Sequence, residues 1–273
     1  MSWADMTKDK DADLQTRKIE LGVEEKFLET LFRYLQNSGE TRVAGLHVTD
    51  ILYPCSRRGY YNALMPPLGL DVAGAIRIWT GVELHKMPML EKHEITLEWS
   101  GISGTIDEYE KGLFIDKKTT RKIPTVYDRK LGEYVVNIRD HHLRQLEYYR
   151  VLLEENGYNV DWGAVLYINV DSGEVMAGLG DIHERKLEDI ESEMSERALN
   201  LKVYLDKKVL PPRDISIRWM CHKYCPYIQQ CMLNVNPTSF LTPEFVDSRW
   251  SIINGEFGEL TRTEPESEST DTS

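Results

Sequence analysis

The sequence lacks a hydrophobic run long enough to cross a membrane, and its first residues lack the pattern of a secretory signal. No apolar stretch approaches the ~20 residues that a membrane helix needs. The first ten residues are polar and mixed in charge, which argues against a signal peptide. Of the 273 residues, 41% are hydrophobic and 29% are charged, as in soluble globular chains of one large or two small domains. We therefore expect a cytoplasmic protein.

Cysteine is also scarce. Four are present: Cys55 far upstream, and a C-terminal group of Cys221, Cys225 and Cys231. In a cytosolic chain, clustered thiols indicate a metal site rather than disulfides. Four thiolates suit either structural Zn²⁺ or a [4Fe–4S] cluster. Pro226, directly after Cys225, and the division into one cysteine plus three favour the iron–sulfur cluster, because zinc ligands more usually come as two close pairs.

A net positive charge, which favours nucleic-acid binding, is missing, since the formal net charge is -12. The charges are unevenly placed, however. The chain beyond Phe257 is acidic, whereas the stretch from residue 111 to residue 130 is basic, with Lys111, Lys117, Lys118, Arg121, Lys122, Arg129 and Lys130. A local basic strip can hold a phosphate backbone whatever the net charge. The alternative for such a strip is a solvated loop.

Periodicity and turn residues predict alternating helices and strands. We expect helices at residues 21–35, 79–85, 140–155 and 181–207, and strands at 93–99, 101–108, 113–119, 133–138, 162–170 and 174–179. Thr49 is expected to cap a short helix that ends before Pro54, Cys55 to open a second one, and Asp140 to cap the helix at 140–155. This order describes a compact α/β core in which the strand at 162–170 joins the sheet through the preceding helix.

The predicted hairpin of residues 101–119 brings acidic side chains and a lysine together. Asp116 and Lys118 are two residues apart and share one face of their strand, with Ile115 on the other face. Asp107 lies near the end of the partner strand, within reach of the same place. Two carboxylates suit Mg²⁺ or Mn²⁺, and a lysine beside them can orient water or stabilise charge on a phosphate. The alternative is a cross-strand salt bridge on a solvated hairpin.

Six motifs occur in a fixed order: Cys55, Gly81-x-x-x-His85, Gly104-x-x-Asp107, Asp116-x-Lys118, Gln145-x-x-x-Tyr149 and the C-terminal three-cysteine group. Together they resemble the RecB-type branch of the PD-(D/E)XK nucleases. More narrowly, they are similar to the iron–sulfur CRISPR-associated exonucleases of the Cas-four family. The resemblance runs from about residue 43 to residue 231. It implies a restriction-endonuclease-like α/β core, a mixed central sheet flanked by helices, with an iron–sulfur region joining the N- and C-terminal segments.

The resemblance also implies residue roles. The expected ligands of Mn²⁺ or Mg²⁺ are His85, Asp107, Asp116 and the carbonyl of Lys117, and Lys118 matches the catalytic lysine. DNA contacts are expected from Gln145 and Tyr149, which border the active site. Arg121 and Lys122, from the basic strip, are further candidates for binding DNA. The expected ligands of the [4Fe–4S] cluster are Cys55, Cys221, Cys225 and Cys231.

These expectations divide the chain into a disordered N-terminus (1–18), a helical region with Cys55 (19–90), the nuclease core (91–210), the cysteine segment (211–235) and an extension with an acidic tail (236–273). The expected activity is metal-dependent cleavage of DNA, as an exonuclease on single-stranded ends, in CRISPR adaptation beside the integrase complex. The alternatives are a non-catalytic DNA-end or redox-sensing module, an adaptor of the CRISPR integrase, and a viral or repair nuclease of the same fold.

Overall fold

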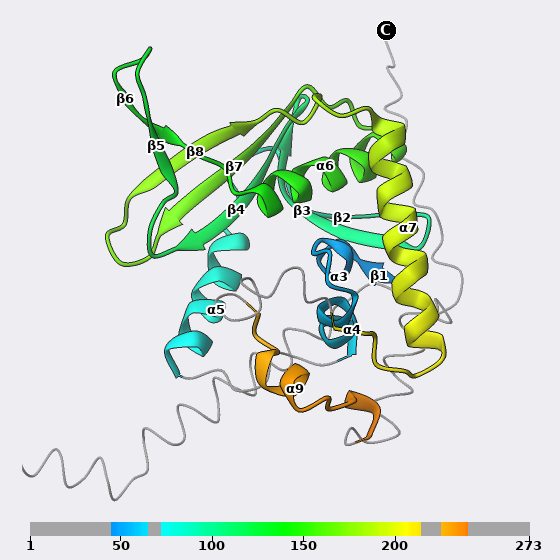
Figure 1. The fold of residues 1–273 in the computed structure, drawn as a ribbon. Coiled ribbons are helices and arrows are strands. Elements are labelled where there is room, and N and C mark those ends of the chain that lie inside the picture. The colour runs from blue at the N-terminus through cyan, green and yellow to red at the C-terminus, as the bar shows by residue number, and fades with distance from the viewer. Residues whose placement is uncertain (1–44, 65–71, 214–224, 240–273) are drawn as a thin grey trace, which may run out of the picture.

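A central mixed sheet flanked by helices forms the body of the protein (Figure 1). The structure, a computed structural model, describes residues 45–64, 72–213 and 225–239. The helix expected at residues 21–35, the acidic tail and Cys221 lie outside these ranges. Among the described residues, no helix is both long and apolar enough to span a membrane.

Six strands make up the sheet, in the order β1-β3-β4-β7-β8 with β2 paired to β3. β1 pairs with β3 and β4 pairs with β7 in parallel, and the other pairs are antiparallel. The strands are β1 (Leu46–His47), β2 (Lys92–Trp99), β3 (Ile102–Glu110), β4 (Leu113–Thr120), β7 (Trp162–Asn169) and β8 (Val175–Gly180). The predicted meander is therefore present, and β7 joins it beside β4 as expected.

One edge of β3 is only partly paired, and this opening defines the candidate site. β2 pairs along one edge of β3 from Ile102 to Tyr109, with a gap at Asp107. The other edge pairs with β1 at Ile102 and Ser103 and with β4 from Glu108 to Glu110. Among the described residues, the stretch from residue 104 to residue 107 therefore has no strand partner on this second edge. Asp107 and Gly104 lie at the two ends of this stretch.

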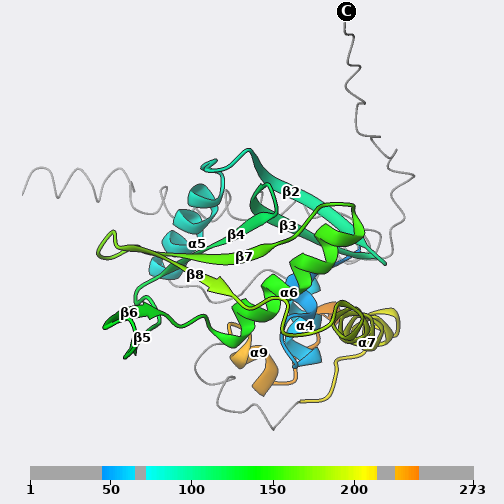
Figure 2. The ribbon, with the colours of Figure 1, turned by 90° about the horizontal axis from the view of Figure 1, so that it is seen from above.

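The helices lie on both sides of the sheet. They are α3 (Val48–Ile51), α4 (Ser56–Leu64), α5 (Val72–His85), α6 (Asp140–Glu155), α7 (Leu187–Asp206) and α9 (Ile228–Met232), followed by a 3₁₀ turn η1 (Pro237–Ser239). α5 and α6 lie on different sides of β4 and β7, and α7 packs beyond α6 and α4 (Figure 2). α9, late in the chain, lies near α4, early in the chain (Figure 1).

The core lies between the sheet and α6, which connects β4 to β7. Residues Leu146, Val151, Leu152 and Leu153 of α6 are fully buried, together with Phe114 of β4. Burial of such side chains contributes on the order of 1.5–3 kcal/mol each. Because α6 is packed on the sheet in this way, its buried side chains Gln145 and Tyr149 are held in place as well.

A two-stranded hairpin projects from this body (Figure 1). It consists of β5 (Thr125–Asp128) and β6 (Glu133–Val136), whereas the sequence predicted one strand here. Its base packs on β8 at Gly178, where an added Cβ would lie 2.7 Å from Cγ1 of Val136. Any larger residue at position 178 would therefore push the base of the hairpin away from the sheet.

The caps or starts of helices differ from prediction in four places, one of which is α5, which begins at Val72 and not at residue 79. His47, not Thr49, is the N-cap of α3: its ring accepts from the backbone N–H of Thr49, and Asp50 accepts from the N–H of His47. Arg139 occupies the N-cap of α6, and Asp140 is the first helical residue, where its negative charge suits the helix dipole. α7 begins at Leu187 rather than near residue 181. The predicted bounds of α6, in contrast, match the structure.

Candidate metal and nucleic-acid site

Asp107, Asp116 and Lys118 meet where the pairing of β3 with β4 stops. Nζ of Lys118 donates to Oδ1 of Asp116 at 2.8 Å. The backbone N–H of Lys117, beyond the last β3–β4 pair, donates to Oδ2 of Asp107 at 2.6 Å. The Asp107 carboxylate therefore takes the place of a strand partner for β4, which fixes its orientation.

His85 reaches this place from the opposite side of the sheet. It is the last residue of α5, and its Nδ1 lies 2.9 Å from Oδ1 of Asp107. The imidazole is 31% exposed while the Asp107 side chain is 8% exposed, so the histidine forms the outer wall of the site. The structure thus brings together residues from three elements: His85 from α5, Asp107 from β3, and Asp116 and Lys118 from β4.

The surroundings of Asp116 disfavour its charged form. Its side chain is 1% exposed, and its Oδ2 atom is buried without a hydrogen-bond partner. Burial raises the pKa of Asp116 to about 6; the nearby charge of Asp107 adds to the rise, while Lys118 and His85 oppose it. An unsatisfied buried polar atom costs on the order of 1–3 kcal/mol. A cation beside Oδ2 would relieve both the missing contact and the repulsion between the carboxylates.

Lys118 remains a cation in this setting. Burial alone would lower its pKa, but the charges of Asp116 and Asp107 outweigh burial and raise the pKa of Lys118 above its usual value. A protonated lysine donates hydrogen bonds and stabilises negative charge, and it is not a base at neutral pH. This fits the predicted role of Lys118 in orienting water and balancing charge.

A buried ion pair between Lys117 and Glu108 supports the site from behind, and sequence reasoning missed it. The two side chains are 2% and 0% exposed and are in direct contact. Nζ of Lys117 also donates to the carbonyl of Met87, and Glu108 accepts from the backbone N–H groups of Met89 and Leu90. The pair therefore holds the chain just after α5. Strand alternation, which places residues 108 and 117 on the face opposite Asp107 and Asp116, was the available signal.

Lys117 accordingly does not belong to the basic strip. Its charge is buried and paired, so its side chain cannot contact DNA as the strip of residues 111–130 had suggested. Arg121 and Lys122 lie on the surface after β4, and Arg121 has a loose ion pair with Asp171 at 3.9 Å. Their contact with DNA stays a prediction.

Gln145 and Tyr149 form the floor of the site. Nε2 of Gln145 donates to the Tyr149 hydroxyl at 2.8 Å, and the residues are 4% and 3% exposed. Burial raises the pKa of Tyr149 well above its usual value, and the charges of Asp116 and Asp107 add to this. Tyr149 fits because residue 104 is glycine: an added Cβ there would lie 3.0 Å from Cε1 of Tyr149 and 2.6 Å from Leu152. In this arrangement the two residues underlie the carboxylates, and their expected DNA contact stays a prediction.

The predicted metal ligands are near one another but are not arranged as a coordination shell. Within the described ranges, no group of three or more histidine, cysteine, aspartate or glutamate side chains could hold a metal ion as it stands. His85 contacts Asp107 and Lys118 contacts Asp116 instead. The unpartnered oxygen of Asp116 and the repulsion between the carboxylates still fit a hard divalent cation, which prefers oxygen ligands. Binding requires that the His85–Asp107 contact be exchanged for contacts to the ion.

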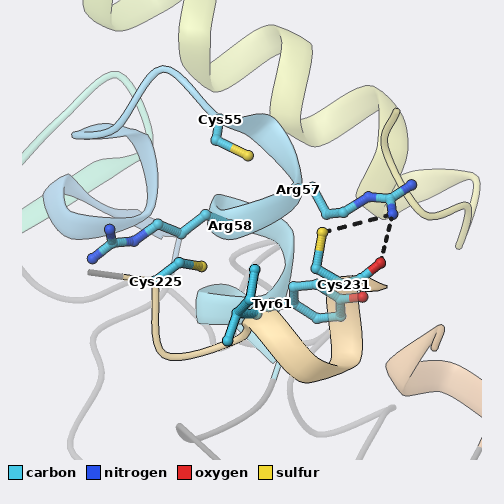
Figure 3. A pocket seen from close by; sticks show the side chains of 7 residues that line it. Cys55, Arg57, Arg58, Tyr61, Cys225 and Cys231 are labelled. Carbon is cyan, nitrogen blue, oxygen red and sulfur yellow. Dashed lines mark hydrogen bonds between the residues drawn. The ribbon is translucent and has the colours of Figure 1, made fainter. Parts of the chain in front are cut away.

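Three of the four cysteines line one pocket (Figure 3). Cys55 lies just before α4, while Cys225 and Cys231 come from the C-terminal segment. Burial raises the pKa of Cys225, and the thiols of Cys55 and Cys231 raise it further, while Arg58 lowers it. Arg57, Arg58, Tyr61 and Ile228 complete the lining. Convergent thiols suit a thiolate-bound cluster, while Cys221 lies outside the described residues.

Direct contacts also hold the C-terminal segment against α4. Nε of Arg57 donates to the carbonyl of Pro211 at 2.6 Å, and its Nη1 donates to Oδ1 of Asn234 at 2.9 Å. Tyr61 stacks on Tyr227 with ring centroids 5.4 Å apart. Tyr60 and Tyr61 are buried, as expected for core tyrosines. The cysteine pocket is thus built into a preformed interface between two distant segments of chain.

No family model and no curated protein matches the chain. Fifteen chains of solved structures do match its fold. One of them, described as the crystal structure of SSO0001, has 19% sequence identity and a TM-score of 0.44, over 74% of this chain and 94% of that one. At this level of similarity the neighbour does not identify the function.

Proposed function

We propose that this protein is a metal-dependent DNA nuclease of the RecB-like PD-(D/E)XK type. The observation that carries the proposal is the buried pair Asp107 and Asp116, with an unpartnered Asp116 oxygen beside a protonated Lys118. A protein that only binds DNA gains nothing from two buried carboxylates, because they repel phosphate. This argues for catalysis over the alternatives of a DNA-end-binding module or an integrase adaptor.

The residues assigned to Mn²⁺ or Mg²⁺ are His85, Asp107, Asp116 and the carbonyl of Lys117. A bound divalent ion supplies Lewis acidity: it polarises a phosphate and lowers the pKa of a bound water. The chain supplies the remainder. Lys118 donates to the attacking water or to the phosphate oxygens and stabilises their growing negative charge. Tyr149 and Gln145 hold the floor of the site, so that the carboxylates keep their orientation.

The cysteine pocket is proposed to hold a [4Fe–4S] cluster on Cys55, Cys225, Cys231 and Cys221. Its role is structural, because it joins α4 to the C-terminal segment and contains no side chain proposed for phosphodiester cleavage. From the resemblance to CRISPR-associated exonucleases we take the substrate to be DNA with single-stranded ends, and the setting to be the processing of new spacers beside the integrase.

Digestion of an end-labelled single strand with Mn²⁺ or Mg²⁺ tests the proposal. Asp116→Asn keeps the shape of the side chain and removes the charge, so cleavage should fall at least about a hundredfold. The matched control is Asp206→Asn, which removes an exposed carboxylate at the end of α7 and should leave the rate unchanged. Equal cleavage by Asp116→Asn and the parent would refute the site. DNA binding by the parent, without cleavage in any divalent metal, would favour the binding-module alternative.

A further inference from the structure

A row of cationic and aromatic side chains lies between the carboxylate site and the cysteine pocket. The Arg58 guanidinium lies over the ring of Tyr53, 3.3 Å from its centroid. The Tyr53 ring lies 5.6 Å from the ring of His141, at the start of α6. Arg139 immediately precedes α6. Two segments of chain, residues 53–58 and 139–141, therefore contribute to one row.

The two arginines of this row have no carboxylate partner among the described residues. Nη1 of Arg58 is buried and makes no hydrogen bond. Arg57, the neighbouring residue, shows the contrast: it turns the other way (Figure 3) and is satisfied by the carbonyl of Pro211 and by Asn234. Buried polar groups are nearly always hydrogen-bonded. Arg57 is thus a structural arginine, whereas Arg58 is held in place by Tyr53 with a donor unused.

The row borders the carboxylate site electrostatically. Burial lowers the pKa of His141 to about 4, and the charges of Arg139, Arg58 and Lys118 lower it further against a small opposing effect of Asp140. His141 is therefore neutral at pH 7, and Arg58 lies over the Tyr53 ring that neighbours it. The start of α6 also lies beside the strand of Lys118: the backbone N–H of Arg139 donates to the Tyr167 hydroxyl at 3.4 Å, and Tyr167 is the partner of Lys118 in the β4–β7 pairing. An anion beside His141 would meet three positive charges within a short distance of Asp116.

We propose that Arg58 and Arg139, with Tyr53 and His141 between them, form a subsite that binds a phosphate of a nucleic-acid strand next to the scissile phosphate. The inference rests on the proposed nuclease function and adds a second position at which the strand is bound. Arg58 as a residue is half-buried, so it contacts the phosphate through the part of the guanidinium that is not buried, and the planar group suits two phosphate oxygens at once. Tyr53 is a positioning residue that orients Arg58 through a cation–π contact.

The subsite also gives the cysteine pocket a role in substrate binding. Arg58 lines that pocket, and its charge acts on Cys225. Cys55 directly precedes α4, which carries Arg58. Cross-linking of Cys55 to the C-terminal cysteines therefore fixes the start of the helix from which Arg58 extends. Loss of the cluster should weaken strand binding through this arginine.

Binding of a labelled oligothymidylate, without divalent metal so that nothing is cleaved, tests the subsite. The dissociation constant is measured over a series of salt concentrations for the parent, Arg58→Gln and Arg139→Gln. Each variant loses one phosphate contact, so the slope of log affinity against log salt should become shallower by about 0.7. Affinity at low salt should fall about tenfold. Lys202→Gln removes the same charge from the exposed face of α7 and should change neither quantity.

Further variants separate binding from folding. Arg139 is exposed, so Arg139→Gln should melt like the parent even if Arg58→Gln is less stable. Arg58→Lys keeps the charge and should keep the slope while losing part of the affinity. Tyr53→Leu should lower affinity with the slope unchanged, because it removes orientation and not charge.

The outcomes distinguish this inference from the proposed function. Unchanged slopes in both Arg58→Gln and Arg139→Gln would overturn the subsite and leave the nuclease proposal standing if the parent cleaves DNA. Shallower slopes in a protein that never cleaves DNA would support the subsite and overturn the nuclease proposal. A parent protein that binds no single strand at all would overturn the subsite.

Discussion

The surroundings of Asp116 set its pKa and thereby make the free energy of unfolding depend on pH. Its pKa is raised from the usual 3.8 to about 6, chiefly by burial and then by Asp107. Between about pH 4 and pH 6, the folded protein keeps a proton on Asp116 that the unfolded chain has released. The contribution of Asp116 to the free energy of unfolding therefore falls as pH rises through this window. A divalent metal reverses the effect, because it favours the ionised carboxylate.

From this we predict that Asp116→Asn stabilises the metal-free protein at pH 7. The free energy of unfolding should exceed that of the parent by about 1–3 kcal/mol at pH 7, and the difference should vanish near pH 4. Added Mn²⁺ should raise the melting temperature of the parent and have little effect on the variant. Chemical denaturation at several pH values measures the difference. Parallel pH profiles for the two proteins would show that the pKa of Asp116 is not raised in the folded protein.

Lys118 is predicted to act on the reaction and not on metal binding. Lys118→Met removes the ammonium and keeps most of the side-chain volume. Loss of one group that stabilises transition-state charge costs about 10²–10³ in kcat. Calorimetric titration with Mn²⁺ should give an affinity close to that of the parent, or tighter, since a competing cation has left Asp116. A variant that cleaves normally but binds the metal poorly would show that Lys118 acts in metal binding and not in the reaction.

At the scale of elements, the end of α5 determines where His85 lies. Contacts outside the helix hold this end in place: Lys117 and Glu108 bind the chain at the end of α5 and just beyond it. Nζ of Lys117 contacts the carbonyls of His85 and Met87, and Glu108 accepts from Met89 and Leu90. This buried pair therefore connects the sheet to the histidine on its far side.

Breaking this pair should destabilise the protein and misplace His85. Glu108→Gln leaves Lys117 buried without a counter-charge, a change that costs about 3–5 kcal/mol in other proteins. The matched control is Glu110→Gln on the same strand, whose ion pair with Lys111 is exposed and should be worth less than about 1 kcal/mol. Restoring neutrality with Glu108→Gln and Lys117→Met together should recover stability but not cleavage. Full cleavage by the double variant would show that His85 is positioned without the pair.

Alternation along strands was enough to predict the site residues on β3 and β4, because period-two geometry places Asp116 and Lys118 on one face. The bounds of α6 followed from Asp140, an expected capping residue, and from the Asn156-Gly157 end. Pairing between elements was not visible in the same way. That residues 104–107 lose their partner on one edge, and that Glu108 meets Lys117, depend on which strands become neighbours. The caps at His47 and Arg139 were missed because Thr49 and Asp140 are the more usual capping residue types.

At the scale of the whole molecule, α4 and the C-terminal segment form one unit. Arg57, Tyr61 and Tyr227 connect them directly, and three cysteines converge between them. The chain between Cys55 and Cys225 includes every strand of the sheet except β1. A cluster bound there would close a very large loop, and loop closure restricts the unfolded chain by an amount that grows only slowly with loop length. Binding of the cluster would also contribute directly to folding.

We therefore predict that Cys55→Ala removes the cluster and weakens this unit without unfolding it. Anaerobically purified parent protein should be brown, and the variant should lose its iron, its sulfide and its visible absorption. Its melting temperature should fall by about 5 °C or more, the change expected for a loss of about 2 kcal/mol in a domain of this size. The direct contacts of Arg57 and Tyr61 should keep the sheet and the nuclease site folded, so the variant should retain metal-dependent cleavage at a lower DNA affinity.

Ser56→Ala, at the next residue, is the control and should keep the colour. A Cys55→Ala protein with full iron and sulfide and an unchanged melting temperature would disprove the cross-link, while a colourless, zinc-containing parent would exclude iron–sulfur and leave the nuclease site unaffected.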